Sequence, residues 1–251
     1  MFKKTAMALL VGAVSLSPFI SQAAQKKLIF ATEATYPPFV YMNANGTMNG
    51  FDADIIEALC NQMHRQCKLV NAPWDSLIPS LQIGRFDSLF GGMGITAQRE
   101  KVVDFTKPYY ENAVTFVIKK GANFTLENIK GKTIGVQVGT TFDRYLRQKY
   151  GNSITIKTYE SNMTALMDLK AGRINAVFLD KPVATMWLKQ KINEDYTDKY
   201  NIYNKKYFGI GNGIAIKKTN PELVKELNTA LTQIKQDGTY QKIVNQWFGK
   251  S

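Results

Sequence analysis

Apolar and polar positions follow two alternating patterns along the chain. Residues 27–31 form a short apolar run that is typical of a strand, whereas apolar residues between 55 and 63 recur at the spacing of one helix face. A strand pattern returns at 87–90, and the same order of strands and helices recurs over 132–180. Because strands and helices alternate, the sequence predicts an α/β fold with mostly parallel sheets.

Two pairs of segments repeat the same order of elements. Residues 81–92 and 169–180 both indicate a helix end, a Gly-Arg turn and a buried strand. Residues 27–36 and 132–141 both indicate a strand followed by a turn and a helix start. Chance similarity between ordinary βα units is one explanation. The other is a pair of similar α/β lobes whose carboxyl strand ends face a shared cleft, where open α/β sheets bind ligands.

The end of the chain is expected to return to the first lobe, because helical patterns at 221–235 and 239–248 follow a β-prone stretch. We predict that lobe 1 comprises residues 24–112 and 209–251 and that lobe 2 comprises residues 113–208. Two antiparallel crossings between the lobes would form a hinge.

Residues 1–23 have the three parts of a secretory signal peptide. Lys3 and Lys4 precede an apolar run over 6–14, and small residues precede a cleavage point after Ala23. An uncleaved membrane anchor is the weaker alternative, because the apolar run is too short to cross a bilayer. The mature protein is expected to be soluble and exported.

Export bears on the two cysteines, Cys60 and Cys67, which close an eight-residue segment that joins a predicted helix over 52–63 to a strand beginning near residue 68. In an oxidising compartment a disulfide is the expected state, and it would stabilise the fold by about 2–3 kcal/mol. Two buried free thiols are the alternative. The role is structural in either case.

Composition excludes several classes of function. The chain has 32 Lys and Arg against 20 Asp and Glu, a formal charge of +12, one His and two Cys. One His cannot form a His-rich metal site, and two Cys cannot form a zinc ribbon. The basic residues are scattered without a nucleic-acid-binding motif, which favours a solvated basic surface. The sequence also contains no serine-hydrolase elbow, P-loop or dinucleotide-binding glycine motif, so no cofactor is expected.

Several polar side chains fall where predicted strands end. Glu33 and Tyr36 follow the first strand, Arg99 lies beyond a glycine-rich turn, and Asp180 ends a strand. Trp74 precedes a helix start. The structural alternatives are an N-cap for Asp180, a solvated charge for Arg99, and packing for Tyr36 and Trp74. Glu33 has the fewest alternatives, because a carboxylate at a strand end has few structural uses.

Thr140 and Thr141 open a predicted helix over 142–150. Their hydroxyls and the first N–H groups of the helix could receive a carboxylate. N-capping is the alternative.

Five motifs in combination resemble the periplasmic amino-acid-binding proteins of ABC importers. They are FATEATYPPF at 30–39, GFDAD at 50–54, WDSLIPSL at 74–81, GITAQREK at 94–101 and GTY at 238–240. The first motif, the segment at 206–211 and the Cys60–Cys67 spacing are most similar to the arginine and basic-amino-acid binders. The resemblance implies a type II periplasmic-binding-protein fold, with two similar α/β lobes joined by a two-stranded hinge. It also implies a periplasmic, monomeric protein that delivers its ligand to an ABC permease.

The resemblance assigns the amino and carboxyl groups of the ligand to both lobes. Arg99 would clamp the α-carboxylate, with N–H groups from the Gly94 turn and the Thr141 region. Asp180 would take the α-ammonium, with a backbone carbonyl near Gly92.

The side chain of the ligand would meet Glu33 at its cationic head, and Tyr36 and Trp74 would stack on it. Two departures from the family affect fine selectivity: glycines stand at 91, 92 and 94 where serines are frequent, and Gln137 and Phe142 lie at variable positions. The predicted ligand contacts are Glu33, Tyr36, Trp74, Gly92, Gly94, Arg99, Gln137, Thr140, Thr141 and Asp180.

A count of charges supports a basic ligand independently of the resemblance. Arg99 together with Glu33 and Asp180 gives the site a charge of −1, which an amino acid with a cationic side chain would neutralise in a desolvated cleft. Arginine is favoured over lysine because a planar guanidinium can stack and can bond a carboxylate with two N–H groups. We therefore expect a binder of arginine, or of basic amino acids generally, and not an enzyme. The rivals are a periplasmic dehydratase with Glu33 as its general acid and a sensory module, which should be fused to a transmembrane segment.

Overall fold

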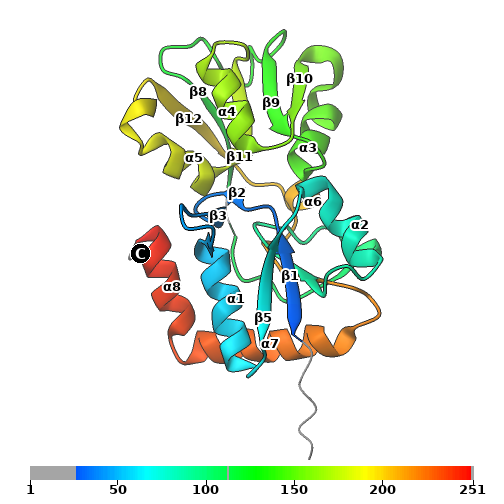
Figure 1. Cartoon of the computed structure of the whole chain (residues 1–251). Helices are drawn as coiled ribbons and strands as arrows, with labels where there is room; N and C mark the ends of the chain where they lie inside the picture. Colours follow the sequence, from blue (N-terminus) through cyan, green and yellow to red (C-terminus); the bar gives the residue numbers. More distant parts are fainter. Residues whose placement is uncertain (1–26, 112, 250–251) are drawn as a thin grey trace, which may run out of the picture.

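The computed structural model describes residues 27–111 and 113–249, which form two α/β lobes, one above the other in Figure 1. The predicted signal peptide, residues 1–23, lies outside the described residues. The strand order in the lower lobe is β5 (Cys67–Asn71), β1 (Leu28–Thr32), β6 (Ser88–Leu89), β13 (Ala215–Ile216) and β7 (Asp104–Phe105). The strand order in the upper lobe is β10 (Thr155–Tyr159), β9 (Thr133–Gln137), β11 (Ala176–Asp180), β8 (Val114–Lys119) and β12 (Tyr196–Ile202). A small third sheet contains β2 (Thr35–Tyr36), β3 (Val40–Met42) and β4 (Met48–Asn49).

The strand directions agree with the prediction of mostly parallel sheets, with one exception in each sheet. β1 runs parallel to β5 and β6, and β9 runs parallel to β10 and β11, as βα units require. In contrast, β13 and β8 run antiparallel to both of their neighbours. Each sheet therefore has four strands that run in one direction, as the prediction of mostly parallel sheets requires, and one strand that runs antiparallel to them. The reason is that β8 and β13 each follow directly on a crossing between the lobes, not on a βα unit.

Helices cover the sheets and confirm the helical patterns of the sequence. They are α1 (Phe51–Gln62), α2 (Leu77–Gln82), α3 (Thr141–Tyr150), α4 (Asn162–Lys170), α5 (Lys181–Leu188), α6 (Lys205–Phe208), α7 (Pro221–Gln236) and α8 (Thr239–Phe248). α7 and α8 pack on α1 in the lower lobe, which confirms that the end of the chain returns there (Figure 1). Over the described part of the chain, no helix combines the length and the apolar character needed to cross a membrane.

The two Gly-Arg turns share one hydrogen-bond pattern. The N–H of Arg85 donates to the carbonyl of Ser80, and the N–H of Arg173 donates to the carbonyl of Asp168, both at 3.0 Å. Both turns then lead into a buried strand, β6 or β11. The sequence repeat is thus also a structural repeat.

Two segments cross between the lobes side by side. The N–H of Asn212 donates to the carbonyl of Tyr110 at 2.7 Å, and the N–H of Tyr109 donates to the carbonyl of Asn212 at 2.9 Å. The segments run antiparallel at this point, as a two-stranded hinge requires. The exact lobe limits, 24–112 and 209–251 against 113–208, stay a prediction.

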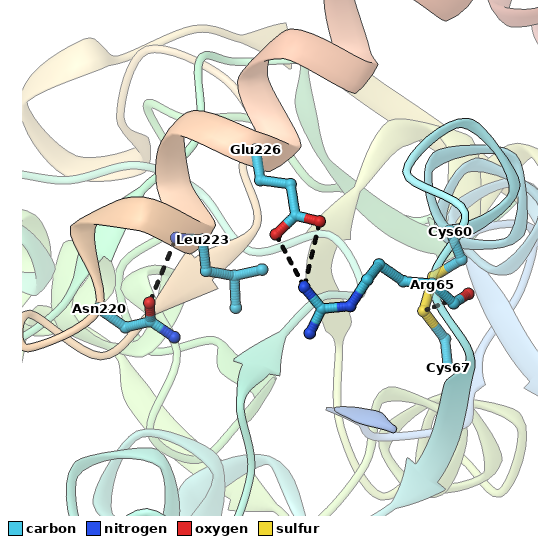
Figure 2. Close-up of polar contacts among 6 residues, drawn as sticks. All are labelled: Cys60, Arg65, Cys67, Asn220, Leu223 and Glu226. Carbon is cyan, nitrogen blue, oxygen red and sulfur yellow. Dashed lines mark hydrogen bonds and ion pairs between the residues drawn. A yellow bond between two sulfur atoms is a disulfide. The ribbon is translucent and has the colours of Figure 1, made fainter. Parts of the chain in front are cut away.

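Cys60 and Cys67 form the predicted disulfide, which joins the end of α1 to the start of β5 (Figure 2). Between them, the guanidinium of Arg65 forms an ion pair with Glu226 on α7 at 3.1 Å. Asn220 caps the start of α7 by accepting the N–H of Leu223 at 3.2 Å. These contacts fasten the α1–β5 connection to α7, at the base of the lower lobe.

Candidate ligand-binding site

A cavity lies between the two lobes, at the carboxyl ends of β1, β9 and β11. Its lining takes residues from both lobes and from the second crossing segment. It includes every predicted ligand contact: Glu33, Tyr36, Trp74, Gly92, Gly94, Arg99, Gln137, Thr140, Thr141 and Asp180. The structure thus brings these residues to one place, and their binding of a ligand stays a prediction.

Arg99 begins a short 3-10 helix, Arg99–Lys101, and is half-buried. Its Nη1 donates to the carbonyl of Gly94 at 2.9 Å, and its Cζ lies 5.4 Å from the centroid of the Trp74 ring. Burial, and then the nearby charge of Arg144, lower the pKa of Arg99 to about 10, so the guanidinium remains cationic at neutral pH. Arg99 is therefore not the solvated surface charge that the sequence left open.

Glu33 accepts one hydrogen bond on each carboxylate oxygen. The hydroxyl of Thr35 donates to Oε1 at 2.7 Å, and Nε2 of Gln137, from the opposite lobe, donates to Oε2 at 2.5 Å. Burial raises the pKa of Glu33, while the bonds from Thr35 and Gln137 oppose the increase. Each oxygen keeps a second lone pair, which is the number that two parallel N–H groups of a guanidinium would need.

Gln137 is held in position by its own lobe. Its Nε2 donates to the carbonyl of Glu160 at 2.8 Å, and its Oε1 accepts Nδ2 of Asn162 at 2.7 Å. The amide therefore presents an N–H group toward Glu33 across the cavity.

Asp180, at the end of β11, is buried and lines the cavity. The hydroxyl of Tyr36, from the opposite lobe, donates to its Oδ2 at 2.5 Å. Burial and the charge of Asp180 raise the pKa of Tyr36 well above its usual value, so the phenol stays protonated. Asp180 precedes α5, but its side chain does not cap this helix, so the alternative of a simple N-cap is wrong.

Thr140 has the structural role that was its alternative. Its hydroxyl accepts the N–H of Asp143 at 3.3 Å, which caps α3, and donates to the carbonyl of Gln137 at 2.8 Å. Thr141 is the first residue of α3 and lines the same wall of the cavity.

Trp74 and the glycines mark places where the lobes come close. Nε1 of Trp74 lies 3.4 Å from the carbonyl of Gly139 in the other lobe. A Cβ on Gly94 would lie 2.4 Å from the carbonyl oxygen of Phe208 on the second crossing segment. A serine at 94 would therefore not fit unless the backbone moved, which gives a physical reason for this departure from the family pattern.

Comparison with known proteins identifies the family. Residues 28–250 match the family described as "Bacterial extracellular solute-binding proteins, family 3". The chain belongs to this family.

Two kinds of relative illustrate the likeness. The chain is 43% identical over 240 residues to the ABC transporter arginine-binding protein 1 of Escherichia coli (strain K12), covering 96% of this chain and 98% of that protein. A Salmonella typhimurium periplasmic binding protein described for its high arginine specificity superimposes with a TM-score of 0.84 at 39% identity, covering 89% of this chain and 99% of the other. An ancestral arginine-binding protein bound to glutamine gives a TM-score of 0.82 at 37% identity, covering 89% of this chain and 98% of that one.

In this solute-binding protein, the residues that line the cavity near the two crossings were not predicted from the sequence. Glu111 lies on the first crossing, and Asn204, Lys205 and Phe208 lie at the N-cap of α6 and in this helix, where the second crossing begins. The position of the predicted hinge could have indicated them, because hinge segments border the cleft. With Glu111 and Lys205 included, the lining contains three carboxylates and two cations. The two added charges cancel, so the net charge of the site remains −1.

No metal site competes with this interpretation. In residues 27–111 and 113–249, no group of three or more His, Cys, Asp or Glu side chains is placed to hold a metal ion.

Proposed function

We propose that this solute-binding protein is exported to the periplasm, captures arginine or another basic amino acid between its lobes, and delivers it to the membrane permease of an ABC importer. The arginine-binding relatives support the choice of ligand. The observation that carries it is the presence of Glu33 in a cavity that already holds Arg99 and Asp180.

Arg99 and Asp180 together satisfy the groups that all amino acids share, the α-carboxylate and the α-ammonium. Glu33 is then a further, half-buried carboxylate whose pKa is raised by desolvation. A cationic side chain would compensate this charge, whereas a neutral ligand would leave it unpaired at a cost. The open lone pairs of Glu33 favour a planar guanidinium within this class.

Binding is proposed to close the lobes. Glu33 and Gln137, Tyr36 and Asp180, and Trp74 and Gly139 make hydrogen bonds between lobes. A ligand that contacts both members of these pairs favours the closed arrangement, because only that arrangement satisfies it completely.

Calorimetric titration of arginine, lysine, ornithine, histidine and glutamine into the mature protein tests the ligand class. Arginine should bind most tightly and glutamine more weakly. Tighter binding of glutamine than of arginine would contradict the proposal. Small-angle scattering with saturating arginine should show a smaller radius of gyration, and unchanged scattering would contradict closure.

We also propose that the protein binds without turnover, because the cavity charges are matched to a ligand and no residue is required as a catalyst. The rival is a dehydratase that uses Glu33 as a general acid. Incubation with a cyclic prephenate-like acid should leave it unchanged, and product formation would favour the rival.

A further inference from the structure

Asp52 lies beneath the cavity floor. It is the second residue of α1 and only 1% exposed, and its Oδ2 accepts the N–H of Gly92 at 2.7 Å. Gly91 and Gly92 line the cavity, whereas Asp52 is not among the lining residues. Because the Gly91–Gly92 peptide is trans, the carbonyl of Gly91 points away from Asp52. Asp52 thus fixes the direction of a backbone group in the cavity wall.

The other oxygen of this carboxylate is also buried, and no cation lies beside it in the described residues. Oδ1 of Asp52 and the Tyr109 hydroxyl are both buried, and they interact with each other: the hydroxyl lowers the pKa of Asp52, and Asp52 raises the pKa of Tyr109. Within the described ranges no Lys or Arg forms an ion pair with Asp52. A buried carboxylate whose donors are two backbone N–H groups and a tyrosine hydroxyl, with no cation beside it, is expensive, and such a group calls for an explanation.

The ionisable groups that face Asp52 come from three directions. Tyr109 and Tyr110 lie on the first crossing segment, Tyr240 lies on α8, and Asp180 lies across the cleft. Burial raises the pKa of Asp52 to about 7, the N–H groups of Gly92 and Gly91 oppose the increase, and the charge of Asp180 adds to it. Protonated and ionised forms therefore both exist near neutral pH.

We propose that Asp52 is a positioning residue for the ligand ammonium, which holds the Gly91–Gly92 turn from beneath and must be ionised for tight binding. This inference rests on the proposed function, in which the α-ammonium lies between Asp180 and the Gly92 region. A cation placed there favours the negative form of Asp52, and that form is the stronger acceptor for the N–H of Gly92. By linkage, a ligand that favours the ionised form binds more tightly as the pH rises and releases a proton when it binds below neutral pH.

A purely structural role predicts a different behaviour. Carboxylates in the first turn of a helix stabilise it, and both Asp52 and Asp54 occupy the first turn of α1. On that account the substitution Asp52→Asn would lower stability at pH 8 and leave the pH dependence of binding unchanged. On our account the pKa of Asp52 is raised, so its ionisation lowers the free energy of unfolding progressively as the pH rises from the ordinary pKa of a carboxyl group to about 7. Asp52→Asn should therefore raise the melting temperature of the ligand-free protein at pH 8.

The test is calorimetry of arginine binding at pH 6, 7 and 8 for the wild type, Asp52→Asn and the matched control Asp54→Asn. The wild type and Asp54→Asn should lose affinity toward pH 6 by up to about tenfold per pH unit, the limit for one proton. Asp52→Asn, which keeps an acceptor for Gly92 but loses the charge, should bind more weakly than the wild type at pH 8 and show a flat profile.

Proton release by the wild type alone, measured in buffers of different ionisation enthalpy, gives a result that does not depend on any variant. Release at pH 6 to 7 that is missing in Asp52→Asn supports the inference. The same pH dependence in Asp52→Asn and wild type, or no proton release by the wild type, overturns it. No binding of arginine by the wild type at any pH would instead overturn the proposed function, and this inference with it.

Discussion

The two Gly-Arg repeats end differently at the cavity. In the sequence repeat, Gly92 of the lower lobe occupies the position of Asp180 in the upper lobe. Asp180 carries its carboxylate directly into the cavity, whereas Gly92 has only its backbone there and is held by Asp52 from a different helix. The repeat thus reproduces backbone geometry, while single residues at the strand ends decide which lobe presents a side chain to the cavity.

A second difference lies behind the turns. In the upper lobe the carboxylate of Asp168 accepts Lys157 and Tyr159, both at 2.7 Å, and also pairs with Arg173. These donors hold the pKa of Asp168 well below its usual range. The lower lobe has Ser80 at the equivalent position, and Arg85 lies over the ring of Phe86 instead. The polar cluster is therefore an addition to one lobe and not a requirement of the turn.

The largest loss of affinity is expected at the two residues proposed to bind the α-carboxylate and the α-ammonium, the groups that all amino acids share. Arg99→Ala in the lower lobe and Asp180→Ala in the upper lobe should each weaken every amino-acid ligand by about 2–5 kcal/mol, because a desolvated charge on the ligand loses its partner. Calorimetry with arginine and glutamine measures this. Lys101→Ala, an exposed change in the same short helix as Arg99, is the control and should bind normally. If Arg99→Ala kept arginine affinity within about threefold of wild type, this assignment would be wrong.

The next effect distinguishes recognition of the ligand side chain from binding of the α-carboxylate and α-ammonium. Glu33→Gln keeps the size of the side chain and removes its charge, so arginine should lose about 1.5–3 kcal/mol, while glutamine should lose nothing and could gain. Paired titrations of both ligands decide the matter, with the exposed Glu100→Gln as control. Equal weakening of both ligands would show that Glu33 only supports the fold.

A smaller effect concerns the contact between Tyr36 and Asp180. Tyr36→Phe keeps the ring and removes the hydroxyl that joins the two lobes, which should cost about 0.5–1.5 kcal/mol of affinity. The loss should be the same for arginine and glutamine, because the hydroxyl donates to Asp180, which is proposed to bind the α-ammonium. A loss confined to arginine would mean that Tyr36 acts on the side chain of the ligand.

The smallest expected effect, on melting temperature, tests whether the polar cluster around Asp168 stabilises the upper lobe only. Arg173→Ala should lower the melting temperature at pH 7 slightly, whereas Arg85→Ala should change it less. Since the pKa of Asp168 is depressed, its stabilising contribution exists above the ordinary pKa of a carboxyl group and is lost as the pH falls. The difference between Arg173→Ala and wild type should therefore diminish in acid. If the melting temperature of Arg173→Ala stayed below that of the wild type by the same amount at low pH, the loss would be due to packing and not to the ion pair.

Strand-end reasoning located most of the cavity from the sequence, because the carboxyl ends of β1, β9 and β11 meet at one edge whatever the details of packing. Glu33 and Asp180 were found in this way. Glu111 and Lys205 were not, since a crossing segment and a helix of a single turn have no periodic pattern that tells which of their residues turn inward. Asp52 was visible in the sequence as part of a helix and of the GFDAD motif, but without a role, because its burial depends on how α1 packs against a turn forty residues away in sequence.

The mixed sheet of the lower lobe has a consequence for the order in which the protein can fold. Its strand β13 lies between β6 and β7 but comes from residues 215–216, after every strand of the upper lobe. As the chain emerges from a ribosome or a translocation channel, the upper lobe has all its pairing partners once residue 202 has appeared. The lower lobe must keep the edges of β6 and β7 unpaired until later, and open strand edges are sites of aggregation. The lobe whose first strand comes earliest in the sequence is thus the last that can be completed.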